Sequence, residues 1–395
     1  MSDTTQATER PLVTLKTHPS PHPFVRRGLV GTSANHLPER CVVRVAAPDG
    51  SPLGEAFWNA RSDIALRRLT QGEQAFDLAA LEASIERAVG LRESIPGLVD
   101  GSQAFRVIHS EGDALSGLVV DVFGDLLSVQ LFSAGWLEIL DELLALLHAR
   151  CGTSHHNVEM SERVARLEGV RPLKKRSPGA PKALKIEEHG VRYHVDLRTG
   201  HKTGFFCDQR DNRHGLLSWV QGARVLDLCC YTGGFGITAA TLGEVESVTA
   251  VELDEDALSV ARNNAKLNQV RVSFVHADAF DWCRQTERNG TRFDVVVLDP
   301  PKFIPTHSEM QAGKGKYRDL NKLAMELVEP GGMLLSCSCS GLLGRDEFLE
   351  LLRSAGRRAN RQVSILGHSG AGPDHPVALE CPETEYLKAV WMRVW

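Results

Sequence analysis

Downstream of Val191 the chain alternates short apolar runs with amphipathic segments, and this pattern constrains the fold more than any other feature. The apolar runs predict strands, and the segments between them predict helices. The clearest helix, 254–267, follows an Asp cap and places Leu258, Ala261 and Ala265 on one face. Strands that alternate with helices form a parallel sheet with helices on both faces. The expected strands are 224–229, 247–253, 272–276, 293–298, 333–338, 362–366 and 386–394.

The 395 residues exceed the usual size of one domain, and the N-terminal part follows other patterns. Residues 11–73 alternate short extended runs with Pro, Gly and Asn, which predicts a small β-rich domain. Residues 74–185 predict an α+β middle domain that begins with a connecting helix at 77–95 and includes a second helix at 136–148. This domain ends in a basic, Pro- and Gly-rich stretch, 171–185, which is typical of a mobile linker or of an arm that touches RNA. Residues 186–395 form the last domain, and the polar start, 1–10, predicts disorder.

The composition of the chain indicates its cellular compartment and limits the partners that it can bind. Nine cysteines, an odd number, and a polar N-terminus favour a reducing cytoplasm over a disulfide framework. No apolar run is long enough to cross a bilayer, and a net charge of −5 gives no overall attraction to membranes or nucleic acid. Contact with RNA therefore requires local basic patches. The β-rich domain carries a modest excess of arginines, which an ordinary solvated surface explains equally well: Arg26, Arg27, Arg40, Arg44, Arg61, Arg67 and Arg68.

Acidic side chains stand at or near the ends of four successive predicted strands. They are Asp227, Glu252, Asp278 and Asp299. Each alone is more often a helix cap, but a doubly wound sheet brings such strand ends together at one edge. A glycine-rich turn, Tyr231-Thr232-Gly233-Gly234-Phe235-Gly236, follows the first strand and lets a ligand approach the backbone. The turn lacks the Gly-x-Gly-x-x-Gly spacing of dinucleotide sites, and the acids suit S-adenosylmethionine.

The chain also resembles a known family. The resemblance rests on Gly200–Arg213 (GHKTGFFCDQRDNR), on Tyr231–Phe235, on Asp299-Pro300-Pro301-Lys302-Phe303, on Ser338-Cys339-Ser340 and, less specifically, on 109–121. These motifs are similar to those of class I RNA methyltransferases that carry an N-terminal PUA domain and form 5-methylcytosine in large-subunit ribosomal RNA. The resemblance implies a PUA-like domain, a Rossmann-like methyltransferase domain, S-adenosylmethionine as methyl donor and no metal. The donor-binding residues that it implies are Phe206, Gln209, Arg210, Asp227, Tyr231, Thr232, Gly233, Gly234, Glu252, Asp278, Ala279 and Asp299.

Methylation at carbon 5 of cytosine requires a nucleophile, because that carbon does not accept a methyl group unaided. A thiolate that adds to carbon 6 makes carbon 5 enamine-like. Cys339 is the expected nucleophile, and Asp299 is expected to engage the base, donating to N3 if protonated or holding the amino group if ionised. Lys302 is also assigned to the catalytic residues; it stands where methyltransferases of exocyclic amines place an aromatic residue after Pro-Pro, which disfavours methylation of an amine. Cys337, two residues from Cys339, would share its face on a strand and competes for the role.

Several alternatives stay open at this point. Both cysteines could be small buried hydrophobes, as free cysteines often are, whereas Cys229 and Cys230 are expected to be packing residues. The chain could methylate a purine without using a thiol, or it could bind RNA as an assembly factor without catalysis. The β-rich domain could serve a homodimer as well as RNA. No pair of Cys-x-x-Cys motifs is present, so the sequence gives no zinc site.

Overall fold

The computed structural model describes residues 10–196 and 205–395. The polar start at 1–9 and the Gly200–Gly204 part of the shared motif lie outside the described residues. Two compact units divide the chain. Among described residues, the first holds 10–99, 104–181 and 374–384, and the second holds 100–103, 182–196, 205–373 and 385–395. Within the described ranges, no helix combines the length and the apolarity that crossing a bilayer requires.

Two five-stranded sheets form the framework of the first unit. In one, of order β1-β3-β4-β5-β2, the strands are β1 (Leu12–Thr14), β2 (Phe24–Arg26), β3 (Arg40–Ala46), β4 (Pro52–Asn59) and β5 (Ile64–Arg68). In the other, of order β10-β9-β8-β7-β6, they are β6 (Ala104–His109), β7 (Leu118–Phe123), β8 (Leu126–Leu131), β9 (His155–Met160) and β10 (Leu173–Arg176). The helices of this unit are α1 (Leu78–Glu93), α2 (Leu140–Cys151) and α3 (Glu162–Glu168).

The two sheets of the first unit share a hydrophobic core. Phe57 of β4 makes edge-to-face contacts with Phe76 and with Trp136, whose ring centroids lie 5.8 and 4.9 Å away. The Asp77 side chain accepts a hydrogen bond from the backbone of Ala80 (2.8 Å) and caps α1, close to the predicted start of the connecting helix. The second expected helix, 136–148, is interrupted: a 3-10 turn at Ala134–Leu137 precedes α2.

The basic stretch 171–185 is only in part the linker that its composition suggested: the boundary between the two units falls at 181/182, but strands occupy both ends of the stretch. Leu173–Arg176 forms β10, which pairs antiparallel with β9 at the edge of the second sheet. Lys174 and Lys175 lie 3.6 and 2.8 Å from Glu159 and Asp141. Charged residues are common on edge strands because they discourage pairing with other chains, so the same composition fits an edge strand.

The arginines of the β-rich domain already have partners within the protein. Arg26 pairs with Asp63, and Arg61 pairs with Glu39 at 2.5 Å. Arg67 is buried within 3.8 Å of both Glu111 and Glu168. The charges of these three arginines are therefore offset locally, and counting arginines in the sequence overstates the positive potential of this surface.

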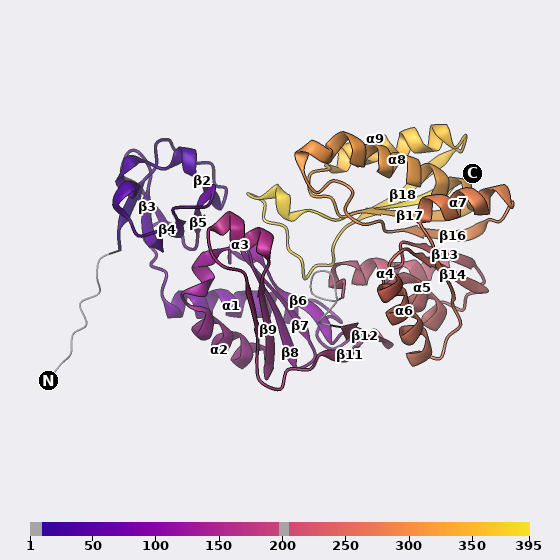
Figure 1. The fold of residues 1–395 in the computed structure, drawn as a ribbon, viewed down its shortest axis with the longest axis horizontal. Coiled ribbons are helices and arrows are strands. Elements are labelled where there is room, and N and C mark those ends of the chain that lie inside the picture. Colours follow the sequence, from indigo (N-terminus) through magenta and orange to yellow (C-terminus); the bar gives the residue numbers. More distant parts are fainter. Residues whose placement is uncertain (1–9, 197–204) are drawn as a thin grey trace. The chain divides into compact units, whose positions relative to one another are not determined.

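The second unit is a seven-stranded sheet with helices on both faces, as the sequence predicted (Figure 1). Helices α4–α6 cover one face, and α7–α9 cover the other. The strands, in the order β15-β14-β13-β16-β17-β19-β18, are β13 (Arg224–Leu228), β14 (Ser247–Glu252), β15 (Ser273–His276), β16 (Phe293–Leu298), β17 (Val328–Ser338), β18 (Val363–Ser369) and β19 (Lys388–Val394). The helices are α4 (Arg210–Leu216), α5 (Gly234–Leu242), α6 (Glu255–Leu267), α7 (Ala279–Arg288), α8 (Met310–Glu326) and α9 (Arg345–Arg358). A hairpin of β11 (Ala183–Glu188) and β12 (Val191–Asp196) precedes them.

The expectation of a wholly parallel sheet is wrong for one strand, β19. β15, β14, β13, β16 and β17 are parallel, but β19 runs antiparallel to both β17 and β18. Two-sided burial makes β17 and β19 equally apolar whichever way they run, so the sequence pattern does not reveal the reversal. The consequence is that the start of β19 lies beside the end of β17, where Ser338 faces Lys388.

Candidate active site

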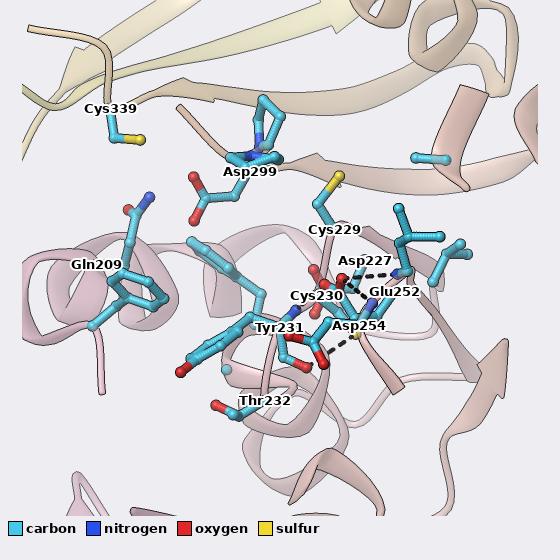
Figure 2. Close-up of a pocket in the computed structure, with 18 of the residues that line it drawn as sticks. Gln209, Asp227, Cys229, Cys230, Tyr231, Thr232, Glu252, Asp254, Asp299 and Cys339 are labelled. Carbon is cyan, nitrogen blue, oxygen red and sulfur yellow. Dashed lines mark hydrogen bonds between the residues drawn. The ribbon is translucent and has the colours of Figure 1, made fainter. Parts of the chain in front are cut away.

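A pocket of about 820 Å³ lies in the second unit, beside the carboxyl ends of the parallel strands. Its volume falls within the range of small-molecule sites, and the position is where open α/β sheets bind ligands. Figure 2 shows Cys339, Asp299 and Gln209 around one end, with Tyr231, Glu252 and Asp254 farther along. The first group comes from the segments after β17 and β16 and before α4. The second comes from the loop after β13, the last residue of β14 and the loop that follows it.

The turn after β13 takes a conformation that exposes its backbone to the pocket. Cys229 and Tyr231 have φ values of 60° and 50°, in the left-handed region that non-glycine residues rarely adopt. Gly233 has a φ of 83°, and a Cβ there would lie 2.7 Å from Ile237 Cδ1. Such strain is common where a backbone must approach a ligand closely. The glycine-rich turn therefore has the backbone shape that the sequence predicted, one that allows a ligand to approach the main chain closely.

Asp227 is a strongly perturbed acid in the pocket. Its Oδ2 accepts a hydrogen bond from the Gly236 backbone (2.8 Å), whereas its buried Oδ1 has no hydrogen-bond partner among the described residues. Burial, with added repulsion from Asp299 and Glu252, raises the pKa of Asp227 to about 7. A cationic ligand in the pocket would relieve this cost, and S-adenosylmethionine carries both a sulfonium and an ammonium group.

The other acids of the donor end accept hydrogen bonds from backbone amides of the loops around the pocket. Glu252 accepts from Tyr231 N (2.8 Å) through Oε2 and from Leu253 N (2.8 Å) through Oε1. Asp278 caps α7 by accepting from Phe280 N (2.8 Å), and Asp254 caps α6 in the same way. The helix-cap interpretation is thus correct for Asp278, although the residue also lines the pocket.

Buried polar contacts hold the donor loop in place. Asn264 of α6 donates to Thr232 O (3.0 Å) and accepts from the backbone of His194 (2.7 Å) in β12. Tyr193 of β12 donates to Gly234 O at 3.2 Å. Because these bonds are buried or partly buried, they hold the loop without help from a ligand.

The opposite end of the pocket is formed by the loops after β16 and β17. Asp299, Pro300, Pro301 and Lys302 all line it, and so does Cys339, which is half-buried. Phe303 extends the wall and packs edge-to-face on Tyr317, with ring centroids 5.0 Å apart.

The four cysteines near the site differ in their surroundings. Burial raises the pKa of Cys229 and Cys230, and the neighbouring acids add to the effect. Cys337 is wholly buried in the sheet core, and burial raises its pKa too. The expectation that Cys337 and Cys339 share a face fails because β17 ends at Ser338, so strand alternation does not extend to Cys339.

Most residues that the sequence assigned to the site do line the pocket. They are Phe206, Gln209, Asp227, Tyr231, Thr232, Gly234, Glu252, Asp278, Ala279, Asp299, Lys302 and Cys339. Arg210 and Gly233 are not among the lining residues; Arg210 is buried at the start of α4, and Gly233 shapes the turn. Cys229 and Cys230, expected to be packing residues, do line the pocket. Sequence reasoning missed Asp254 and Phe280, for which only their proximity to predicted strand ends gave any signal, and Lys316 of α8, for which there was none.

One cluster of possible metal ligands occurs among the described residues, in the first unit. It consists of His22, Cys381 and Glu383. His22 Nδ1 accepts a hydrogen bond from Phe24 N (3.0 Å), so the neutral ring carries its proton on Nε2, which lies 3.3 Å from Glu383 Oε2. A metal would require that nitrogen to be bare, and the arrangement fits a hydrogen-bonded pair better than a metal centre.

Comparison with known proteins identifies the family. Residues 121–376 match the model of an S-adenosylmethionine-dependent methyltransferase family, and residues 20–71 match a PUA-like domain. This protein belongs to that methyltransferase family. Its cofactor is S-adenosylmethionine, and its N-terminal domain is PUA-like. Among similar curated proteins, the ribosomal RNA large subunit methyltransferase I of Shewanella denitrificans is 36% identical, with 95% of this chain and 96% of that protein covered. The protein of the same name from Erwinia tasmaniensis is 35% identical, with 94% of this chain and 95% of that protein covered.

Two solved structures of methyltransferases have a fold similar to that of this chain. A methyltransferase complexed with SAH superposes with a TM-score of 0.81 at 19% identity, covering 98% of this chain and all (100%) of that one. An S-adenosylmethionine-dependent methyltransferase from Streptococcus mutans gives a TM-score of 0.77 at 20% identity, covering 91% and 92%. Both extend across the PUA-like, middle and methyltransferase parts of the chain.

Proposed function

We propose that this methyltransferase forms 5-methylcytosine in large-subunit ribosomal RNA through a covalent bond between Cys339 and carbon 6 of the base. The substrate class is supported by the names of relatives that match nearly the whole chain. The chemistry is supported by one observation above all: a half-buried thiol lines the same pocket as the acids of the donor end.

The contrast among the cysteines favours Cys339 as the nucleophile. The thiolate is the reactive form, so a nucleophile needs surroundings that tolerate negative charge. Cys229 and Cys230 lie among acids, which oppose thiolate formation, and Cys337 is closed off in the core. Cys339 instead lines the pocket together with Lys302, a cation.

The proposed reaction uses these residues in sequence. The Cys339 thiolate bonds to carbon 6, and the displaced electron pair makes carbon 5 nucleophilic. S-adenosylmethionine supplies the methyl group that carbon 5 takes up. A base then removes the carbon-5 proton, the sulfur–carbon bond breaks and the thiolate is regenerated.

Asp299 and the two prolines after it would hold the base during these steps. The Asp299 carboxyl faces the same space as Cys339 and Gln209 (Figure 2). Pro300 and Pro301 fix the backbone after Asp299, so a flipped base would meet a rigid wall. Lys302, rather than an aromatic residue, follows them, which favours carbon-5 methylation over methylation of an exocyclic amine.

A trapping experiment tests the proposal. A transcript of large-subunit ribosomal RNA that contains 5-fluorocytosine is incubated with protein and S-adenosylmethionine, and covalent complexes are separated by denaturing electrophoresis. Fluorine does not leave as a proton does, so the wild type should accumulate a stable adduct. Cys339→Ala should form none, whereas the matched change Cys337→Ala should retain it.

Nucleoside analysis of an ordinary transcript gives the second readout. The wild type should produce 5-methylcytidine, and Cys339→Ala should not. Methylation of a purine that survives Cys339→Ala would replace the proposal with a mechanism that needs no thiol. Binding of RNA without any methyl transfer would favour an assembly factor instead.

A further inference from the structure

Lys388, the first residue of β19, is a buried lysine that the reaction outlined above does not use. Its side chain is only 2% exposed, and lysines are rarely buried to that degree without a counter-charge. Its Nζ donates to two backbone carbonyls, Ser340 O (2.7 Å) and Tyr386 O (2.9 Å). Among the described residues it makes no ion pair with a carboxylate. Keeping such a charge buried costs free energy, and a role at the neighbouring site would explain why it is kept.

The register of the sheet places Lys388 against the turn that carries Cys339. Lys388 faces Ser338 across the β17–β19 pairing, and its Nζ extends past that residue to the carbonyl of Ser340. Lys388 therefore contacts the residues on both sides of Cys339, Ser338 and Ser340. Ser340 is held from the other side as well, because its hydroxyl contacts Tyr317 Oη at 2.9 Å and accepts from Ile304 N at 3.2 Å.

The charges around Lys388 and Cys339 act on one another. Burial lowers the pKa of Lys388 to about 8, and negative charge on Cys339 is the strongest influence that opposes this lowering. Glu385 also favours the protonated lysine, whereas Arg345 and Lys302 disfavour it. Arg345 is partly offset by Glu385, which lies 2.6 Å away. Since an electrostatic interaction is reciprocal, the ammonium group favours the thiolate as much as the thiolate favours it.

We propose that Lys388 is a positioning residue that holds the Ser340 carbonyl and stabilises Cys339 as a thiolate. This inference rests on the proposed function, in which Cys339 attacks the base. Lys388 acts through Cys339, and the Lys388 ammonium supplies the positive charge that a reactive cysteine requires.

The test measures the thiol directly. Alkylation of Cys339 by iodoacetamide is followed against pH, with mass spectrometry of the peptide that contains it, in the wild type and in Lys388→Met, Lys388→Gln and Lys388→Arg. We expect the pKa of Cys339 to rise in the two neutral variants, with roughly tenfold slower alkylation near pH 7 for each pKa unit. Lys388→Arg, which keeps the charge, should restore the wild-type profile.

The three variants separate charge from hydrogen bonding. Gln keeps a donor for the Ser340 carbonyl but carries no charge, so a purely structural role would leave its thiol profile unchanged and would overturn the proposal. Lys322→Met, on α8, removes a lysine that pairs with Glu326 and should leave the profile as in the wild type. Should Lys388→Met not fold, the wild type itself decides: a Cys339 pKa at or above the ordinary value of about 8.5 contradicts the proposal.

The alkylation experiment does not depend on methyl transfer, so the role of Lys388 and the proposed function can fail separately. If Cys339→Ala still forms the fluorocytosine adduct, the proposed function fails, whatever the thiol profile shows. If Cys339→Ala abolishes the adduct while Lys388→Gln and Lys388→Met leave the thiol pKa unchanged, only the role of Lys388 fails.

Discussion

Replacing Asp227 by Asn should stabilise the ligand-free protein while weakening its donor site. The pKa of Asp227 rises from the ordinary 3.8 to about 7, chiefly because the side chain is buried. At about 1.4 kcal/mol for each pKa unit, ionised Asp227 costs the folded protein roughly 4 kcal/mol above pH 7. Asn removes this charge and keeps an acceptor for the Gly236 amide, but it buries an amide group at the position of Oδ1, at a cost of about 1–3 kcal/mol.

The direction of the pH dependence follows from the raised pKa. Below 3.8 Asp227 is protonated in both the folded and the unfolded chain, so its ionisation costs no stability. Between pH 3.8 and about 7, Asp227 is ionised in the unfolded chain but still protonated in the folded one, so the stability of the wild type falls as the pH rises. Above about pH 7, Asp227 is ionised in both states and causes no further loss of stability. The amide side chain of the variant does not titrate, so its burial cost is the same at every pH. Asp227→Asn should therefore be about 1–3 kcal/mol more stable than the wild type at pH 8 and, toward pH 4, about 1–3 kcal/mol less stable.

Thermal unfolding at several pH values measures this difference. Because the chain has two units, the relevant transition is the one that added S-adenosylmethionine shifts upward. At pH 8 the variant should melt several degrees higher, at about 2–4 °C for each kcal/mol. The matched control is Asp281→Asn on α7, an acid-to-amide change at an exposed side chain. An equal gap between Asp227→Asn and wild type at pH 5 and pH 8 would refute the reasoning.

Three further outcomes follow from the donor site and its supports. The affinity for S-adenosylmethionine, measured by calorimetry, should fall as pH drops below about 7, because protonation of Asp227 removes negative charge beside a cationic ligand; a flat profile would argue against that contact. Gly233→Ala should cost about 1–3 kcal/mol and weaken donor binding, since a Cβ would lie 2.7 Å from Ile237, whereas Gly290→Ala, at a φ of 70° with open space, should cost less and leave binding intact. Glu188→Gln should lower the melting temperature by the equivalent of about 3–5 kcal/mol, because Arg213 would lose its buried partner 2.7 Å away; a small change would show that solvent reaches the pair.

The core of the methyltransferase domain was predictable because its signals are local. β16 spans Phe293–Leu298, as the apolar run predicted, and α6 begins directly after its Asp254 cap. A run of β-branched residues and a capping side chain each act within a few positions, so one sequence is enough to reveal them. The strand ends then place the four acids near one another without further information.

Long-range pairing accounts for what the sequence did not reveal. The charge of Arg67 is offset by Glu168, about a hundred positions away, and no local pattern announces that contact. The direction of β19 is likewise set by its partner β17 rather than by its own residues. Lys388 was missed for the same reason, since its burial depends on β19 pairing with β17, about fifty positions earlier in the chain.

The two ends of the pocket differ in charge, because Asp299 at the Cys339 end is accompanied by lysines whereas the donor end is acidic. Asp227 and Glu252 make the donor end acidic, which favours a cationic methyl donor and keeps Cys229 in its thiol form. At the other end, Lys302 lines the pocket with Cys339, and Lys388 is buried behind the turn that carries it. If this contrast directs the chemistry, a cysteine at the acidic end does not substitute for Cys339, however close it lies to the methyl donor. Restoring adduct formation in Cys339→Ala would therefore require a thiol beside these lysines, not merely one in the pocket.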